Sequence, residues 1–177
     1  INDTWGYFLI GGGGYSASTK TSLTDGGMGY GAGGVTYTCS PNLSFGLGAG
    51  VSSQLEDDPR GLPVIMVNWR INEDWNLRVL NGATISYDIS HEKKVILDAS
   101  AKYHRRQYRT DGDGAVIDED VTVEFGTTYN FTPKFGLRGF VGVSAARNIE
   151  IRSHNDKVTD QDVDPSPFFG VRALVTF

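Results

Sequence analysis

The stretch VTVEFGTTYNF, residues 121–131, alternates between two kinds of side chain. Every odd-numbered position except Thr127 is apolar or aromatic, and every even-numbered position is polar or glycine. A period of two over this length indicates a β-strand with one apolar face and one polar face. The stretch therefore predicts a strand whose two faces meet different surroundings.

The same alternation recurs along the chain and predicts an all-β, antiparallel, up-and-down fold. The segments 75–80 and 82–89 carry it least clearly, so ten strands are expected and eight are the alternative. The first two strands are rich in glycine, and their faces are not assigned from the sequence. The ten expected strands are 3–18, 27–39, 43–54, 62–71, 75–80, 82–89, 93–109, 119–131, 135–152 and 165–177.

The connections between these segments alternate in length. Tight turns are predicted at 40–42, 72–74, 90–92 and 132–134, where Pro, Asn, Asp and Ser gather. Longer polar loops are predicted near 19–26, 54–61, 110–118 and 153–164, with a short break at 80–82. Short turns at one end and long loops at the other are typical of a transmembrane β-barrel. Residues 1–177 are expected to form one such barrel domain.

Composition excludes several other classes of protein. No apolar run reaches the ~18 residues that a membrane-spanning helix needs. The net charge of −5, without a basic stripe, argues against nucleic acid as a partner. The single cysteine, Cys39, excludes a disulfide within the chain.

A soluble, lipocalin-like barrel would show the same alternation, and three features favour a barrel in lipid. The polar face carries many glycines and serines, which would make room inside a barrel for a few long side chains. The segments 93–109 and 135–152 are long for a compact sandwich. Aromatic residues of the apolar face gather near the short turns and the C-terminus, as in a membrane-interface girdle. These are Tyr37, Phe45, Trp69, Trp75, Tyr87, Tyr129, Phe131, Phe135 and Phe177.

The last segment, Phe169–Phe177, alternates strictly except at Leu174 and ends on an aromatic residue. In this it resembles the terminal strand of the bacterial outer-membrane β-barrel superfamily, which includes the small OmpA-like and OmpW-like barrels. The resemblance covers the whole chain as architecture and does not single out a subgroup with a known activity. It implies a place in the bacterial outer membrane, with membrane lipid and lipopolysaccharide as surroundings. It also implies recognition of the C-terminal strand by the barrel-assembly machinery, and it allows protein partners in the envelope.

Alternate residues of a strand share a face, and this parity predicts a network of charged side chains on the polar face, inside the expected barrel. If the strands flanking loop 110–118 pair symmetrically, His104 lies opposite Glu124, with Lys102 nearby. Glu124 is then expected to pair with one of these two residues, and Arg138 to lie near another carboxylate or backbone carbonyls. Such a network would fill a narrow barrel as a plug, or it would line a pore. Its members are Arg70, Arg78, Asp88, Asp98, Lys102, His104, Glu124, Arg138 and Arg172.

The function expected from these patterns is a structural or membrane-anchoring outer-membrane barrel, or a subunit of a larger envelope assembly. A narrow passive channel for small solutes is the alternative. A second alternative is an enzyme at the barrel rim that uses His154, but no catalytic motif surrounds this residue. His91 lies in the predicted tight turn Ser90-His91-Glu92, whose adjacent side chains cannot converge as a triad. We therefore expect no catalytic residue, no metal and no cofactor.

Overall fold

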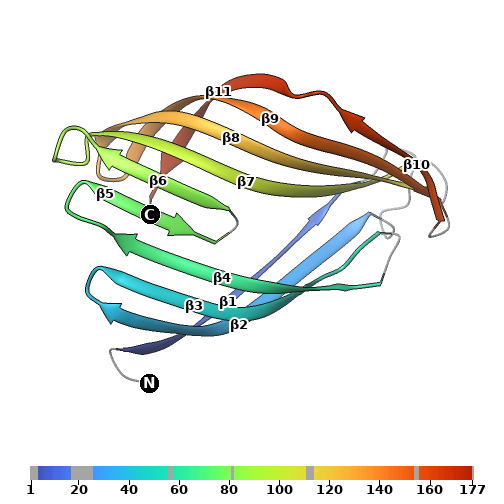
Figure 1. Cartoon of the computed structure of the whole chain (residues 1–177), viewed down its shortest axis with the longest axis horizontal. Helices are drawn as coiled ribbons and strands as arrows, with labels where there is room; N and C mark the ends of the chain where they lie inside the picture. The colour runs from blue at the N-terminus through green and yellow to red at the C-terminus, as the bar shows by residue number, and fades with distance from the viewer. Residues whose placement is uncertain are drawn as a thin grey trace.

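The computed structural model describes residues 4–16, 26–55, 58–80, 82–110, 114–153 and 156–176. These residues form one antiparallel sheet of eleven strands without a helix (Figure 1). No helix of the described residues is long and apolar enough to cross a membrane. The strands are β1 (Trp5–Tyr15), β2 (Gly27–Ser40), β3 (Leu43–Ser52), β4 (Arg60–Arg70), β5 (Trp75–Val79), β6 (Ala83–Asp88), β7 (Val95–Arg109), β8 (Gly114–Thr132), β9 (Phe135–Ser153), β10 (Asp156–Val163) and β11 (Ser166–Val175).

Each strand from β1 to β10 pairs with the next one along the chain, which is the up-and-down order predicted from the sequence. β11 pairs with residues 135–144 of β9, and β10 pairs with residues 147–153 of the same strand. The sheet therefore has ten positions side by side, and β10 and β11 share the last one. Asp164 and Pro165 separate these two strands, and proline has no N–H to donate to a ladder.

Two sequence predictions about the strands are wrong. Residues 153–164 were expected to form a loop, but they contain β10, so the described sheet has eleven strands rather than ten or eight. β10 has no apolar alternation. It is held by its backbone pairing with β9 and by the Asn148 side chain, which donates to Asp160 and Asp162. β8 begins at Gly114 instead of residue 119, which shortens the predicted loop 110–118.

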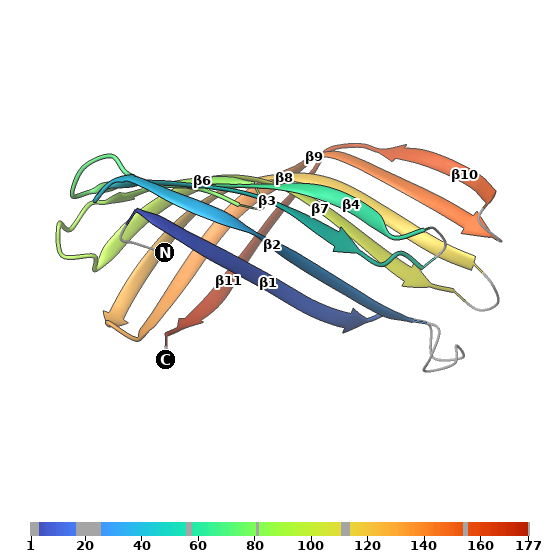
Figure 2. The same cartoon turned by 90° about the horizontal axis from the view of Figure 1, so that it is seen from below.

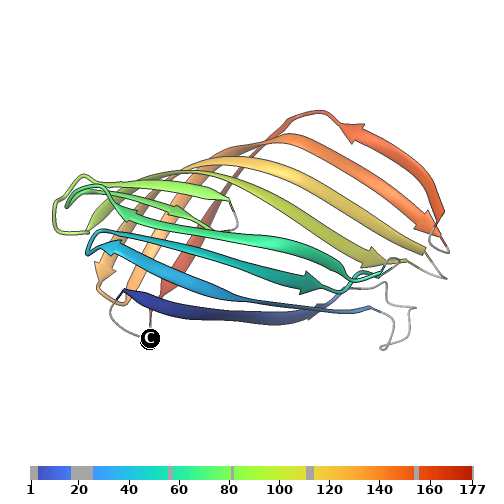
Figure 3. The ribbon, with the colours of Figure 1, turned by 60° about the horizontal axis from the view of Figure 1, so that its bottom comes forward.

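The sheet curves into an arch, and its two edge strands, β1 and β11, descend on the same side of the arch (Figures 2 and 3). These two strands are not paired with each other. The closed barrel expected from the sequence is thus found as an open, curved sheet. Closure of a sheet requires a particular stagger between its first and last strands, and the described strands do not make that pairing.

The two faces of the sheet differ in the way that the alternation predicts. On one face, long side chains reach over glycines of neighbouring strands. The Arg138 guanidinium covers Gly126, and the Phe168 ring covers Gly142. Side chains on this face also touch across an intervening strand, as Arg138 of β9 and Asp98 of β7 do. Such convergence marks the concave side of the arch, which is called the polar face below.

The opposite, convex face carries the large apolar side chains, and many of them are exposed. Leu9 and Phe169 are each 87% exposed, whereas Glu124 on the polar face is 4% exposed. In a protein that folds in water, apolar side chains are buried and charged ones are exposed. The described sheet shows the reverse distribution over most of its length.

Candidate functional site

Four charged side chains from four strands meet on the polar face. Arg138 of β9 lies between the carboxylates of Asp98 on β7 and Glu124 on β8. Its Nε donates to Asp98 Oδ2 at 2.9 Å, and its Nη1 donates to Glu124 Oε2 at 3.1 Å. Arg172 of β11 completes the group, because its Nη2 donates to Glu124 Oε1 at 2.9 Å. We call these four residues the ion-pair cluster; its formal charge is zero.

Most of the ion-pair cluster is removed from solvent. The side chains of Glu124, Arg138 and Asp98 are 5%, 9% and 11% exposed, whereas that of Arg172 is 47% exposed. A buried charge is tolerated when a partner and hydrogen bonds compensate for its lost hydration. Every charged group of the cluster has such a partner. The arrangement suits a rigid polar packing unit.

An aromatic ring separates the two arginines of the cluster. The Phe140 centroid lies 5.0 Å from the Arg138 Cζ and 4.3 Å from the Arg172 Cζ, within the range of cation–π attraction. Phe168 packs edge-on against Phe140 at 6.2 Å. The Phe140 ring lies over Gly170, where a side chain would collide with it. Glycine at this position therefore lets the aromatic ring and both guanidinium groups share a narrow space.

Further polar pairs continue from the cluster toward the long loops. Arg147 Nε donates to Asp118 Oδ1 at 2.8 Å, and Arg106 approaches the same carboxylate at 3.6 Å. The Ser144 hydroxyl donates to Asp120. Because Asp118 and Asp120 are also buried, paired polar groups fill the concave side of β7, β8 and β9 over much of their length.

Strand pairing places all nine predicted network residues on the polar face, because residues directly opposite each other in a ladder share a face. Only four of them meet in the cluster. Arg70 and Arg78 have no carboxylate within ion-pair distance among the described residues. Asp88 instead accepts hydrogen bonds from Ser90 and from the Lys93 backbone, and so fixes the turn between β6 and β7.

The predicted partners of Glu124 are wrong. Ser100 lies opposite Glu124, while His104 lies opposite Asp120 and Lys102 opposite Thr122. The predicted register assumed a hairpin centred on loop 110–118, but β8 already starts at Gly114, which moves the centre toward the N-terminus. Glu124 consequently reaches the arginines of β9 and β11.

The described members of the predicted aromatic girdle lie in a band at the end of the sheet that carries the short turns. Ring pairs link neighbouring members: Trp75 with Tyr87 at 4.7 Å and Phe131 with Phe135 at 5.7 Å. Trp5, whose face the sequence left unassigned, packs against Tyr37 at 4.8 Å and extends the band to β1. Tyr129, also in the band, packs against Phe131. Phe177 lies outside the described residues.

His91 lies in the turn between β6 and β7, and its Nδ1 is 2.8 Å from Asp74 Oδ1 in the turn between β4 and β5. It is not part of the cluster and is exposed. The hydrogen bond and the charge of Asp74 raise the pKa of His91 above its usual value, and Asp88 and Glu73 add to this effect. His154, the other histidine considered for catalysis, lies outside the described residues.

This raised pKa predicts how stability depends on pH. The protonated form is favoured by folding, so the contribution of His91 is fully present below its unfolded pKa of ~6.5 and is lost as pH rises through its higher folded pKa. Wild type should therefore lose stability between pH 6 and pH 8 relative to His91→Asn, which keeps a residue suited to the positive φ of 57°. Urea unfolding at both pH values measures the difference. A difference between the two proteins that does not vary with pH would show that the pair is not formed.

No group of three or more His, Cys, Asp or Glu side chains that could hold a metal ion occurs in the described part of the chain. The fold and the cluster define a class: an up-and-down antiparallel β-sheet protein with an ion-paired concave face and an apolar convex face. The chain belongs to the family described as Domain of unknown function (DUF6268), which matches residues 1–172. Comparison with curated proteins and with solved structures gave no match.

Proposed function

We propose that this chain is a structural or membrane-anchoring β-barrel of a bacterial outer membrane. The observation that carries the proposal is the inverted distribution of side chains, with apolar residues exposed on the convex face and paired charges buried on the concave face. Phe125 is 61% exposed while its neighbour Glu124 is 4% exposed. Lipid around the convex face would remove its apolar side chains from water, which would account for this distribution.

The extent of the apolar surface fits a membrane. On β8 it runs from Val121 to Phe131, which is eleven residues, and a tilted transmembrane strand needs ~9–11. Beyond this segment the pattern of burial changes. Ala115 and Ile117, on the same side of β8, are buried and neighbour polar residues such as Glu119. The segment from 114 to 120 would then project beyond the membrane on the long-loop side.

A barrel in lipid requires β1 and β11 to pair, because unpaired backbone groups are costly in hydrocarbon. The two edges would join the ten positions of the sheet into a ring with an even number of strands, as is usual in bacterial barrels. We propose membrane lipid and lipopolysaccharide as the surroundings of the convex face. The C-terminal strand would present the chain to the barrel-assembly machinery, and envelope proteins are further proposed partners.

Cysteine labelling on intact bacteria tests this topology. Glu73→Cys, in a short turn, and Gln161→Cys, on β10, are both at exposed positions and are made in a Cys39→Ser background. A membrane-impermeant maleimide should label Gln161→Cys in intact cells, and Glu73→Cys only after permeabilisation. Equal labelling of the two variants in intact cells, or recovery of the chain in the soluble fraction, would contradict the proposal. The purified protein should carry little current in a planar bilayer, since paired side chains fill the concave side of β7, β8 and β9; a steady current would favour a passive channel.

A further inference from the structure

The sheet contains a notch, which is a gap between β4 and β7 beyond the point where the short hairpin of β5 and β6 ends. These strands have five and six residues, whereas β4 and β7 on either side have eleven and fifteen. β4 pairs with β5 only over residues 67–70, and β7 pairs with β6 only over residues 96–101. Residues 60–66 and 102–109 therefore face each other with no strand between them.

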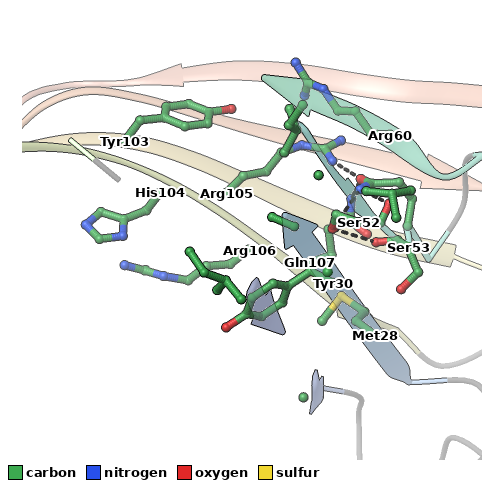
Figure 4. Close-up of a pocket in the computed structure, with 18 of the residues that line it drawn as sticks. Met28, Tyr30, Ser52, Ser53, Arg60, Tyr103, His104, Arg105, Arg106 and Gln107 are labelled. Carbon is green, nitrogen blue, oxygen red and sulfur yellow. Dashed lines mark hydrogen bonds between the residues drawn. The ribbon is translucent and has the colours of Figure 1, made fainter. Parts of the chain in front are cut away.

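A cavity of about 860 Å³ lies at this notch (Figure 4). Apolar and aromatic groups from both halves of the sheet make much of its wall, including Met28, Tyr30, Val64 and Leu80. Tyr103 also lines the cavity. It belongs to the set of alternate β7 residues that face the convex side, and it is 46% exposed. The cavity is thus bounded partly by side chains that reach the apolar surface of the sheet.

The charges along the cavity have one sign. Among the described residues, its lining includes Arg60, Arg105 and Arg106 but no aspartate or glutamate. Arg105 donates to Glu119 at 2.9 Å, and Arg106 is 3.6 Å from Asp118, so acids outside the lining partly compensate these two. Arg60 is exposed and has no carboxylate within ion-pair distance among the described residues. An anionic ligand would supply a partner for Arg60.

Polar contacts between distant segments form another part of the cavity lining. Gln107 on β7 binds the Gln54 side chain and accepts the Leu55 N–H at 2.8 Å, and Arg105 also donates to Gln54. These contacts anchor the connection between β3 and β4 at the free edge of β7. They leave the apolar wall and Arg60 as the two parts of the cavity that a ligand could engage.

We infer that the notch binds a single-chain anionic amphiphile, with a long-chain fatty acid as the occupant. The acyl chain would lie against the apolar wall, and the carboxylate would meet Arg60. The cavity volume falls in the ~300–1,000 Å³ range typical of sites for one small ligand. The cationic lining matches the carboxylate, and the apolar wall disfavours a nucleotide or a sugar. Entry from lipid through the notch rests on the proposed function, whereas binding itself does not.

A fluorescence titration tests the inference, using 11-(dansylamino)undecanoic acid and its uncharged methyl ester with the full chain in lipid nanodiscs. Wild type should bind the acid at least ten-fold more tightly than the ester. Arg60→Gln should abolish that preference without weakening the ester, and Arg60→Lys should restore most of it. Val64→Trp, which fills the cavity, should weaken both probes ten-fold or more. Ile65→Trp, the adjacent position on the convex face, should leave both unchanged.

Equal binding of acid and ester to wild type, or an unaltered preference in Arg60→Gln, would overturn the inference. Equal effects of Val64→Trp and Ile65→Trp would also overturn it, because they would indicate partition into lipid rather than a site. The Arg60 variants change an exposed side chain, so the test does not depend on the folding of Val64→Trp. If the chain fails to enter nanodiscs, the proposed function fails, and the same titration in buffer still tests the notch.

Discussion

Phe125→Arg is expected to lower the free energy of unfolding from a bilayer by about 2–4 kcal/mol, the cost of an arginine facing lipid near the midplane of a barrel. Phe125 is near the middle of the apolar stretch 121–131 and is exposed on the convex face. A charged side chain there would lose its hydration without gaining a partner. Urea unfolding of the protein from lipid vesicles measures the change.

Val158→Arg on β10 is the matched control. Val158 is 64% exposed and Phe125 is 61% exposed, so a protein surrounded by water would tolerate arginine at both positions with similar, small changes. β10 pairs with the part of β9 that lies beyond the apolar stretch, so we expect Val158→Arg to change stability by ~0.5 kcal/mol or less. Similar values for the two variants would argue against a membrane around the convex face.

The faces of the strands could be predicted from sequence because alternation depends only on local geometry. Along β8 the period of two places Val123 and Phe125 on one face and Glu124 on the other, whatever the rest of the sheet does. The strands β1 and β2 were harder, since glycine at Gly11, Gly12 and Gly13 gives no contrast between faces. Their faces follow only from pairing, which sets Tyr7 beside Val35.

The strand β10 could not be predicted from such a pattern. Its residues, DKVTDQDV, resemble a solvated loop in composition. What makes them a strand is a partner, the free edge of β9 beyond the end of β11. Pairing of this kind depends on how far β9 extends, which alternation alone does not determine.

The ion-pair cluster was predictable as a set of residues on one face but not as a set of contacts. Parity places Asp98, Glu124, Arg138 and Arg172 together, yet the contact between Asp98 and Arg138 crosses the intervening strand β8. Such a contact depends on the curvature of the sheet and on the register of the hairpin formed by β7 and β8. The predicted start of β8 lies too late in the chain, so the predicted register was wrong. The role of Phe140 was missed, although Gly170 opposite it is a signal that a large side chain needs room.

Arg138→Met is expected to be more damaging than any other single change in the cluster. Among the described residues, Arg138 is the only ion-pair partner of Asp98 and one of two partners of Glu124, and the substitution removes it from both. Removing one partner of a buried ion pair typically costs ~3–5 kcal/mol, because the remaining charge stays buried without compensation. Arg172→Met should cost about 1 kcal/mol or less, since the Arg172 side chain is half exposed and solvent screens its charge.

A double-mutant cycle separates this effect from lost packing around the Arg138 side chain. In the background Asp98→Asn with Glu124→Gln, the carboxylates are already neutral, so Arg138→Met should cost much less than in wild type. Urea unfolding of the four proteins from vesicles gives the coupling free energy between Arg138 and the two acids. Costs that simply add, or an Arg138→Met variant as mild as Arg172→Met, would mean that water reaches the cluster freely. Strong coupling would instead show that the cluster is a dry packing unit, which is what an anchoring barrel with a filled interior requires.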